Sequence, residues 1–489
     1  MYVDPELKQL EESASKIWEL ALSMNLDPFP THFEIVPASI MYEFGAYGIP
    51  GRFSHWTHGK AYHRIKTMYD YGLSKIYELV INNDPSYAFL LEGNSILQNK
   101  LVIAHVLAHS DFFKHNVYFE PTNRQMVDAV SINADRIRKY EFLHGKLEVE
   151  EFLDAVLSIQ EHIDPNVRIK HKRPDADPNA APSPRAYDDL FSDSELHSQQ
   201  GPQQEKKFPA QPEKDLLHFI AQNAAGLDDW QRDIIDMVRN EMLYFLPQMQ
   251  TKIMNEGWAS YWHAHMLRQL ELSESEYLEF AELHSSVLSP SKTQVNPYYI
   301  GMKMFEDIER RWDNPTEEEK RKYGRKGGEG RQKIFEVREV DNDVSFIRSY
   351  LTADLVRDLD LYIYKTEGEE LKVVETDWEK IRDSLVASMT NFGTPYIVVE
   401  DADHRRNREL YLKHQYEGIE LDLDYAEKTL PYVYKLWGRT VHLESVVDNA
   451  KVVITYDGQS CTAKKDVPAP AAGPSGGPGI ASSNNQHQP

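Results

Sequence analysis

Two histidines four residues apart, in "KLVIAHVLAHSDFFKHN" (residues 100–116), could bind a metal ion. His105 and His109 lie one helical turn apart, so their imidazoles project from the same face of a helix. Zinc-binding helices use this spacing, commonly with a glutamate directly after the first histidine, and Val106 occupies that position here. The pair by itself fits two interpretations: half of a metal site, or two histidines in an apolar core.

A second run, "MQTKIMNEGWASYWHAHMLRQL" (residues 249–270), supplies a carboxylate and a third histidine. Glu256 and His263 fall on the apolar stripe of a helix, two turns apart, whereas His265 falls on the opposite face. A buried carboxylate is unfavourable unless it is paired or ligates a metal, and Gly257 allows another element to approach closely. The predicted ligands of a divalent zinc or iron ion are His105, His109, Glu256 and His263. The alternative is a buried hydrogen-bond network of the same side chains that ties two helices together.

Other polar residues could complete a site. In "YEFGAYGIPGRFSHWTHGKAYHR" (residues 42–64) the glycines and Pro50 interrupt any helix, and Glu43, Arg52 and His55 could line a pocket. The alternative is a rigid aromatic loop that packs on the core. Glu92, just before the helix of the histidine pair, is a candidate catalytic base, and a carboxylate stabilised by the helix dipole is the alternative.

The helix that carries the histidine pair has a clear start signal. Ser95 and Gln98 form the capping-box pattern Ser-x-x-Gln, and an apolar stripe that includes His105 and His109 follows at helical spacing. The pair should therefore belong to the buried face of the helix. If the stripes of both helices face each other, the four predicted ligands converge within the span of one coordination shell.

The periodicity changes along the chain and predicts an α+β fold. Residues 1–165 and 214–325 read as one mostly helical domain, interrupted by residues 166–213, whose seven prolines and few large apolar side chains predict disorder. Residues 330–462 alternate short β-branched runs, such as "DLYIYK" and "AKVVITYDG", with helical patterns, which predicts a smaller α+β domain. Residues 463–489, rich in Pro, Gly and Ser, predict a disordered tail.

Composition excludes several classes of function. The chain has 489 residues with 54 basic and 78 acidic side chains, a net charge of −24, which argues against binding to nucleic acid or to anionic membranes. Its one cysteine, Cys461, excludes an intramolecular disulfide framework. It has no apolar run long enough for membrane insertion, and its first residues lack the pattern of a secretion signal. We therefore expect a cytoplasmic location.

Three stretches, "GRFSHW…GK", "YELVINNDPSYAFLLEGNS…LQNKLVIAHVLAHSDFFK" and "MNEGWASYWH", together resemble the SpoVR family (stage V sporulation protein R), over about residues 5–460. The resemblance implies a role in building the spore cortex, or a broader envelope or stress role in bacteria without spores. It also implies two partners, a serine protein kinase and a companion protein with its own metal-binding fold.

The "EGWA" helix is similar, more distantly, to the third-ligand helix of some zinc peptidases. That likeness implies two histidine ligands, His105 and His109, and a third ligand, Glu256. Val106 replaces the catalytic glutamate, so Glu92 or a carboxylate near the Arg52–His55 loop would have to act as the base. Two hypotheses for function follow. One is metal-assisted hydrolysis, and the other is a non-catalytic adaptor that recruits partners such as the kinase and whose His/Glu cluster is structural.

Overall fold

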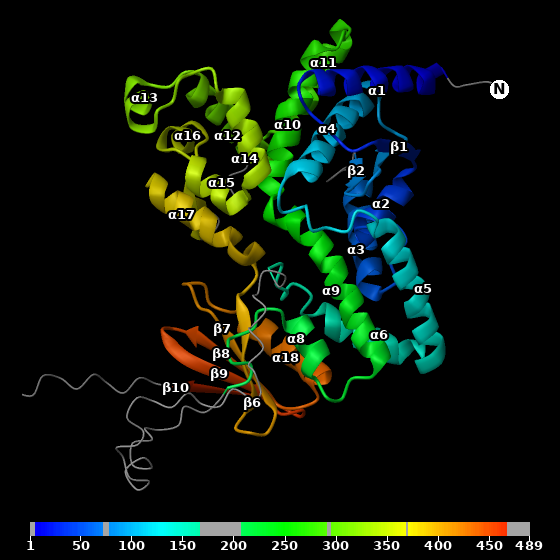
Figure 1. Cartoon of the computed structure of the whole chain (residues 1–489), viewed down its shortest axis with the longest axis vertical. Coiled ribbons are helices and arrows are strands. Elements are labelled where there is room, and N and C mark those ends of the chain that lie inside the picture. Colours follow the sequence, from blue (N-terminus) through cyan, green and yellow to red (C-terminus); the bar gives the residue numbers. More distant parts are fainter. Residues whose placement is uncertain (1–4, 72–77, 167–206, 291–294, 368–369, 467–489) are drawn as a thin grey trace, which may run out of the picture. The chain divides into compact units, whose positions relative to one another are not determined.

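The computed structural model describes residues 5–71, 78–166, 207–290, 295–367 and 370–466 (Figure 1). These residues form two compact units. The first holds the described residues up to 166 together with 217–223 and 227–394, and the second holds 207–216, 224–226 and 395–466. Most of the predicted insert (166–213) and of the predicted tail (463–489) lies outside the described residues. No helix in the described segments combines the length and apolar character needed to cross a bilayer.

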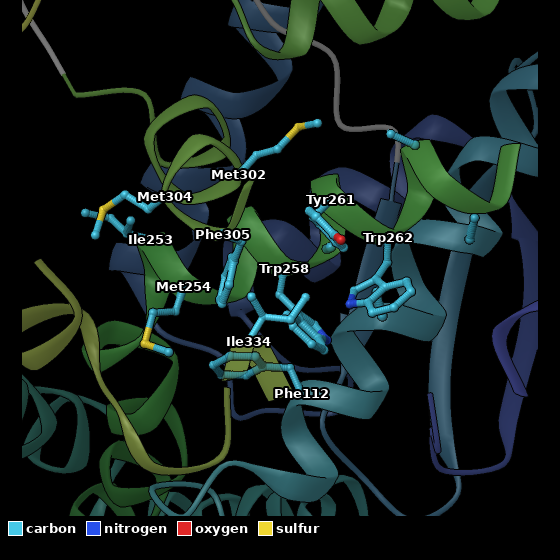
Figure 2. Close-up of a cluster of buried hydrophobic side chains, with 14 of the residues drawn as sticks. Phe112, Ile253, Met254, Trp258, Tyr261, Trp262, Met302, Met304, Phe305 and Ile334 are labelled. Carbon is cyan, nitrogen blue, oxygen red and sulfur yellow. The ribbon is translucent and has the colours of Figure 1, made fainter. Parts of the chain in front are cut away.

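Two long helices, α4 (Ile96–His115) and α10 (Lys252–Gln269), form the centre of the first unit. α4 begins as predicted: the Ser95 hydroxyl accepts from the Gln98 amide, and the Gln98 side chain accepts from the Ser95 amide. The two helices pack on each other and are covered by α1 (Pro5–Ser23) and α12 (Pro297–Asp313), so most of their residues are buried. Large side chains such as Trp258 and Phe305 fill this core (Figure 2).

α10 and α12 touch through their backbones. A Cβ atom placed on Gly257 would lie 2.3 Å from the carbonyl carbon of Gly301, and one on Gly301 would lie 2.1 Å from the carbonyl oxygen of Ile253. No real Cβ contact is so short, so only glycine fits at either position. The close approach expected beside Gly257 is therefore present, and the partner is α12.

The mostly helical character predicted for the N-terminal part is confirmed. The remaining described helices before residue 395 are α2 (Ala38–Tyr47), α3 (Trp56–Asp70), α5 (Met126–His144), α6 (Lys146–Leu157), α8 (Leu216–Asn223), α9 (Asp229–Gln250), α11 (Glu274–Val287), α13 (Glu317–Tyr323), α14 (Gly330–Val340), α15 (Asp343–Tyr350), α16 (Ala353–Asp358) and α17 (Trp378–Met389). A short 3-10 helix, η3 (Thr390–Gly393), follows α17.

The structure contains a small sheet beside α4 that the sequence analysis does not predict. Its strands are β1 (Thr31–Val36), β2 (Glu78–Ile81) and β3 (Ser86–Leu91), in the order β1-β3-β2. β1 runs parallel to the central strand β3, and β2 runs antiparallel to it. The strands are only four to six residues long, and such short runs are easily masked by neighbouring helical patterns.

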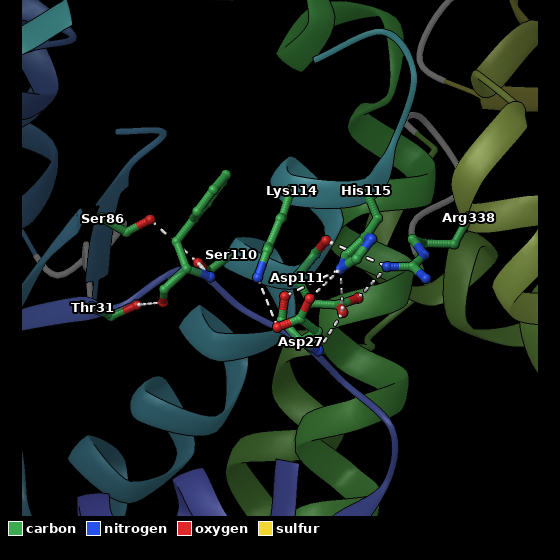
Figure 3. Close-up of polar contacts among 9 residues, drawn as sticks. Asp27, Thr31, Ser86, Ser110, Asp111, Lys114, His115 and Arg338 are labelled. Atoms are coloured by element: carbon green, nitrogen blue, oxygen red, sulfur yellow. Dashed lines mark hydrogen bonds and ion pairs between the residues drawn. The ribbon is translucent and has the colours of Figure 1, made fainter. Parts of the chain in front are cut away.

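A buried ion pair ties three helices of this unit together. Asp111 of α4 accepts from Arg338 Nη1 of α14 at 3.0 Å and from Trp258 Nε1 of α10 at 3.0 Å. Its other oxygen accepts from the amide of Asp27 at 2.8 Å, so both carboxylate oxygens are occupied. Figure 3 shows the Asp27, Asp111 and Arg338 part of this network, in which His115 lies against Asp27.

The second unit is built on a five-stranded sheet in the order β10-β9-β8-β7-β6. The strands are β6 (Ile397–His404), β7 (Glu409–His414), β8 (Val441–Val447), β9 (Ala450–Tyr456) and β10 (Cys461–Asp466). All neighbours are antiparallel except β7 and β8, which are parallel and are joined through α18 (Leu423–Trp437). The α+β class predicted from the sequence is thus confirmed.

The division between the units falls after residue 394, later than the boundary expected near residue 330. Ile381 and Val386 of α17 belong to the apolar core built around α4 and α10. β4 (Ile363–Glu367) and β5 (Glu370–Glu375) pair only with each other among the described strands. Their β-branched runs look like those of the later strands, because periodicity does not reveal which core a segment joins.

Candidate metal centre

Helices α4 and α10 and strand β2 bring four possible ligands together. His105 Nε2 lies 3.6 Å and His109 Nε2 lies 3.5 Å from Glu256 Oε2. On its other side, His105 Nε2 lies 3.4 Å from Glu78 Oε1. Ligand atoms of Glu78, His105 and His109 all lie within 4.8 Å of one another, a spacing that could hold a metal ion.

These separations match a coordination shell better than hydrogen bonds. Charge-assisted N–H···O bonds are about 2.7–2.9 Å long. A tetrahedron around an ion with bonds of about 2.0–2.2 Å has edges of about 3.3–3.6 Å. The distances of 3.4, 3.5 and 3.6 Å between the histidine nitrogens and the two carboxylates fall in that interval.

The Nδ1 atoms of His105 and His109 make hydrogen bonds to side chains outside the site. His109 Nδ1 lies 2.9 Å from Asn255 Oδ1, which can only accept, so Nδ1 carries the proton and Nε2 presents a lone pair to the site. His105 Nδ1 lies 2.8 Å from His263 Nδ1, and His263 Nε2 lies 3.0 Å from His284 Nδ1. If each imidazole in this chain donates one hydrogen bond outwards, His105 Nε2 is also left free to ligate. Such outer contacts fix ring orientation at metal sites.

Two atoms of the cluster are left without a hydrogen bond. His105 Nε2 and Glu256 Oε2 are among the buried side-chain atoms of the described residues that have no hydrogen-bond partner, and they are the two that lie in this cluster. Unsatisfied buried polar atoms are rare in folded proteins, and each one calls for a partner. Both atoms face the point where an ion would sit, so the donor set fits a divalent cation.

Electrostatics couple the cluster. Burial raises the pKa of Glu256, but the His105 and His109 rings outweigh burial and hold that pKa well below its usual range. Burial lowers the pKa of His109, but Glu256 outweighs burial and raises it overall. Burial and the nearby Glu256 and Glu78 raise the pKa of Tyr298, whose ring stacks on His105, so its hydroxyl stays protonated. Because ligation needs a neutral imidazole, a metal ion and a proton compete for His109.

A cavity of about 620 Å³ opens onto the cluster, within the usual size range of ligand pockets. Its walls come from β2, α4, α10, α11 and α12, and they include Glu78, His105, His109, Glu256 and Tyr298. Apolar side chains make up much of the rest. The arrangement therefore combines a cation site with room for an organic ligand, which is the requirement for metal-assisted chemistry.

The structure brings together His105, His109 and Glu256 but places His263 differently from the prediction. Both His263 nitrogens are engaged by other histidines, and the side chain is fully buried, although it also lines this cavity. Because both of its nitrogens make contacts to other imidazoles, His263 has no free lone pair for an ion that His105 and Glu256 would share. His265 bonds the carbonyl of Tyr261 on its own helix and does not line the cavity, consistent with the expectation that it faces away.

Glu92, the candidate base, is exposed in the turn after β3 and does not line this cavity. Glu43 and Arg52 line a separate cavity of about 440 Å³. His55 lines neither cavity: it is buried, and its Nε2 lies 3.2 Å from Asp154, as in the packed-loop alternative.

Glu78 is the site residue that sequence reasoning missed. It starts a four-residue strand, β2, that precedes α4 in the chain with β3 between them, and its side chain is 22% exposed. The run "YELVIN" around it is β-branched and apolar, which is a signal for a strand. Nothing in one sequence indicates that this strand lies across from the histidine pair.

Comparisons with known proteins identify relatives of this chain over most of its length. A family model described as "SpoVR like protein" matches residues 4–394, and one described as "SpoVR-like C-terminal domain" matches residues 395–448. The boundary between the two matches coincides with the division between the structural units. The Escherichia coli (strain K12) protein named "Uncharacterized protein YcgB" is 31% identical over 485 residues, covering 91% of this chain and 93% of that relative. No solved structure gives a significant match. The chain belongs to the SpoVR family.

Proposed function

We propose that this chain is a metal-dependent hydrolase whose helical unit holds one divalent zinc or iron ion. The proposed ligands are His105, His109 and Glu256. The observation that carries the proposal is the pair of buried atoms without hydrogen bonds, His105 Nε2 and Glu256 Oε2, which face each other at 3.6 Å. When bound, a divalent ion lowers the pKa of water and polarises a carbonyl oxygen.

Two further side chains complete the proposed chemistry. Glu78 is the second carboxylate beside His105, and we assign it the role of general base and leave the ligand role to Glu256, because Glu78 lines the cavity from the side of β2. It replaces the glutamate that is missing at Val106. Tyr298, whose raised pKa keeps its hydroxyl protonated, can donate a hydrogen bond to negative charge that develops on a substrate oxygen.

The non-catalytic adaptor remains the second hypothesis. A purely structural His/Glu cluster is expected to satisfy its own polar atoms. The two atoms left without partners therefore favour a metal. The physiological setting that we propose with it is the one implied by the family: the cytoplasm, and spore-cortex formation or envelope and stress physiology, beside a serine protein kinase and its companion protein.

The test is the metal content of purified protein loaded with zinc or iron. We expect one ion per wild-type chain, loss of the ion in His109→Ala with the fold retained, and full occupancy in the control His265→Ala, whose side chain lies outside the cavity. Glu78→Gln should keep the ion and abolish hydrolysis of a synthetic peptide mixture followed by mass spectrometry. A wild-type chain that stays metal-free after loading overturns the proposal.

A further inference from the structure

β2 is an edge strand. In the sheet order β1-β3-β2, its inner side pairs with β3 through residues 78–81, and its outer side pairs with no strand among the described residues. Edge strands expose backbone N–H and C=O groups at a regular spacing, which makes them templates for a further strand.

The outer edge of β2 faces the cavity. Successive side chains of a strand point to opposite faces of its sheet, yet Glu78, Leu79 and Val80 all line the same cavity. One face of the sheet could contribute only alternate residues. Three consecutive lining residues mean that the cavity meets the strand edge-on, beside the two histidines.

We propose that the substrate is an extended polypeptide that adds to β2 as a new strand and passes one of its carbonyl groups over the His105–His109–Glu256 cluster. This proposal rests on the hydrolase function proposed above and names its substrate class. Among hydrolysable biological compounds, only a polypeptide carries alternating donors and acceptors at the repeat of a β-strand, about 3.3 Å per residue. Glycosides and phosphate esters do not match an edge strand in this way.

The size and lining of the cavity fit this occupant. The four residues of β2 span about 13 Å, enough to pair with three or four residues of a peptide. Leu101 and Val102 of α4 and Leu283 and Val287 of α11 line the cavity and offer apolar surface for alternate side chains. Backbone pairing would therefore supply affinity, and these apolar walls would select the substrate side chains.

The first experiment uses synthetic tripeptide hydroxamates, whose hydroxamate ligates a metal, together with analogues methylated at one backbone nitrogen at a time. In an added strand, only every second amide faces β2. Methylation of those amides should weaken binding to the metal-loaded full chain about 5- to 10-fold, the effect of one lost hydrogen bond. Methylation at the intervening position should have little effect. Equal affinities for all analogues would overturn strand addition while leaving the metal site intact.

The second experiment separates this inference from the metal. Capped peptides of the same sequence without hydroxamate are added to the metal-free chain, and amide hydrogen exchange is followed by mass spectrometry. Protection of residues 78–81 is expected, with no change in residues 31–36 of β1, the opposite edge of the same sheet. A chain that binds no metal but shows this protection would refute the hydrolase and keep the peptide site. Absence of protection at saturating peptide would overturn the peptide site.

Discussion

Asn255→Ala should weaken metal binding without removing a ligand. Asn255 Oδ1 accepts the proton of His109 Nδ1 at 2.9 Å, and Asn255 is 8% exposed, so water does not readily replace it. In the variant, His109 can ligate through Nε2 only if its Nδ1–H stays buried without an acceptor. Loss of such an outer contact reduces metal affinity about 10- to 100-fold, which corresponds to about 1.4–2.7 kcal/mol.

The assay is a competition titration of zinc between the protein and a chromogenic chelator, which gives the ratio of dissociation constants. Asn255→Asp is the matched control: its carboxylate accepts the same hydrogen bond, so affinity should equal or exceed that of the wild type. Thermal melting of the metal-free proteins shows whether either change alters the fold itself. If Asn255→Ala binds zinc as tightly as the wild type, His109 does not ligate in the orientation that we describe.

Two other changes test the frame around the site. Gly257→Ala should lower the melting temperature sharply, because its Cβ would lie 2.3 Å from the backbone of α12. The control is Gly59→Ala, at an exposed position in the first turn of α3 with nothing within 4 Å, which should be neutral or stabilise by up to about 1 kcal/mol. Equal melting curves for the two variants would contradict the close helix contact. The hydrogen bond from Lys100 lowers the pKa of Glu276 to about 2, so the stability that this pair adds is present above about pH 4.5 and is lost as the pH falls towards 2. Chemical unfolding of Glu276→Gln between pH 7 and 2 should show a smaller loss than the wild type, and parallel curves would disprove the linkage.

Local signals in the sequence predicted the helices of the site well. The Ser95–Gln98 capping box marks the start of α4, and the apolar stripes of α4 and α10 place His105, His109 and Glu256 inwards, as the structure has them. These features depend on neighbours within one or two turns, and such neighbours are visible in the sequence.

Two features of the site, the role of His263 and the presence of Glu78, could not be predicted from local patterns in the sequence. A helical stripe gives the direction of a side chain but not its hydrogen-bond partners, so the stripe could not reveal that other histidines engage both nitrogens of His263. Glu78 reaches the cluster because β2 packs against α4, which is a tertiary arrangement. The boundary after residue 394 depends likewise on which core α17 joins, and no local pattern encodes that.

The contact between Gly257 and Gly301 also decides which walls of the cavity can yield when a ligand enters. Glu256 lies on α10 and Tyr298 lies on the first turn of α12. Because the two backbones touch with no layer of side chains between them, these helices cannot slide past each other by changing rotamers, as packed helices usually do. α10 and α12 therefore behave as one rigid wall of the cavity. Any widening of the cavity has to come from the walls that β2 and α11 form, because their side chains can repack.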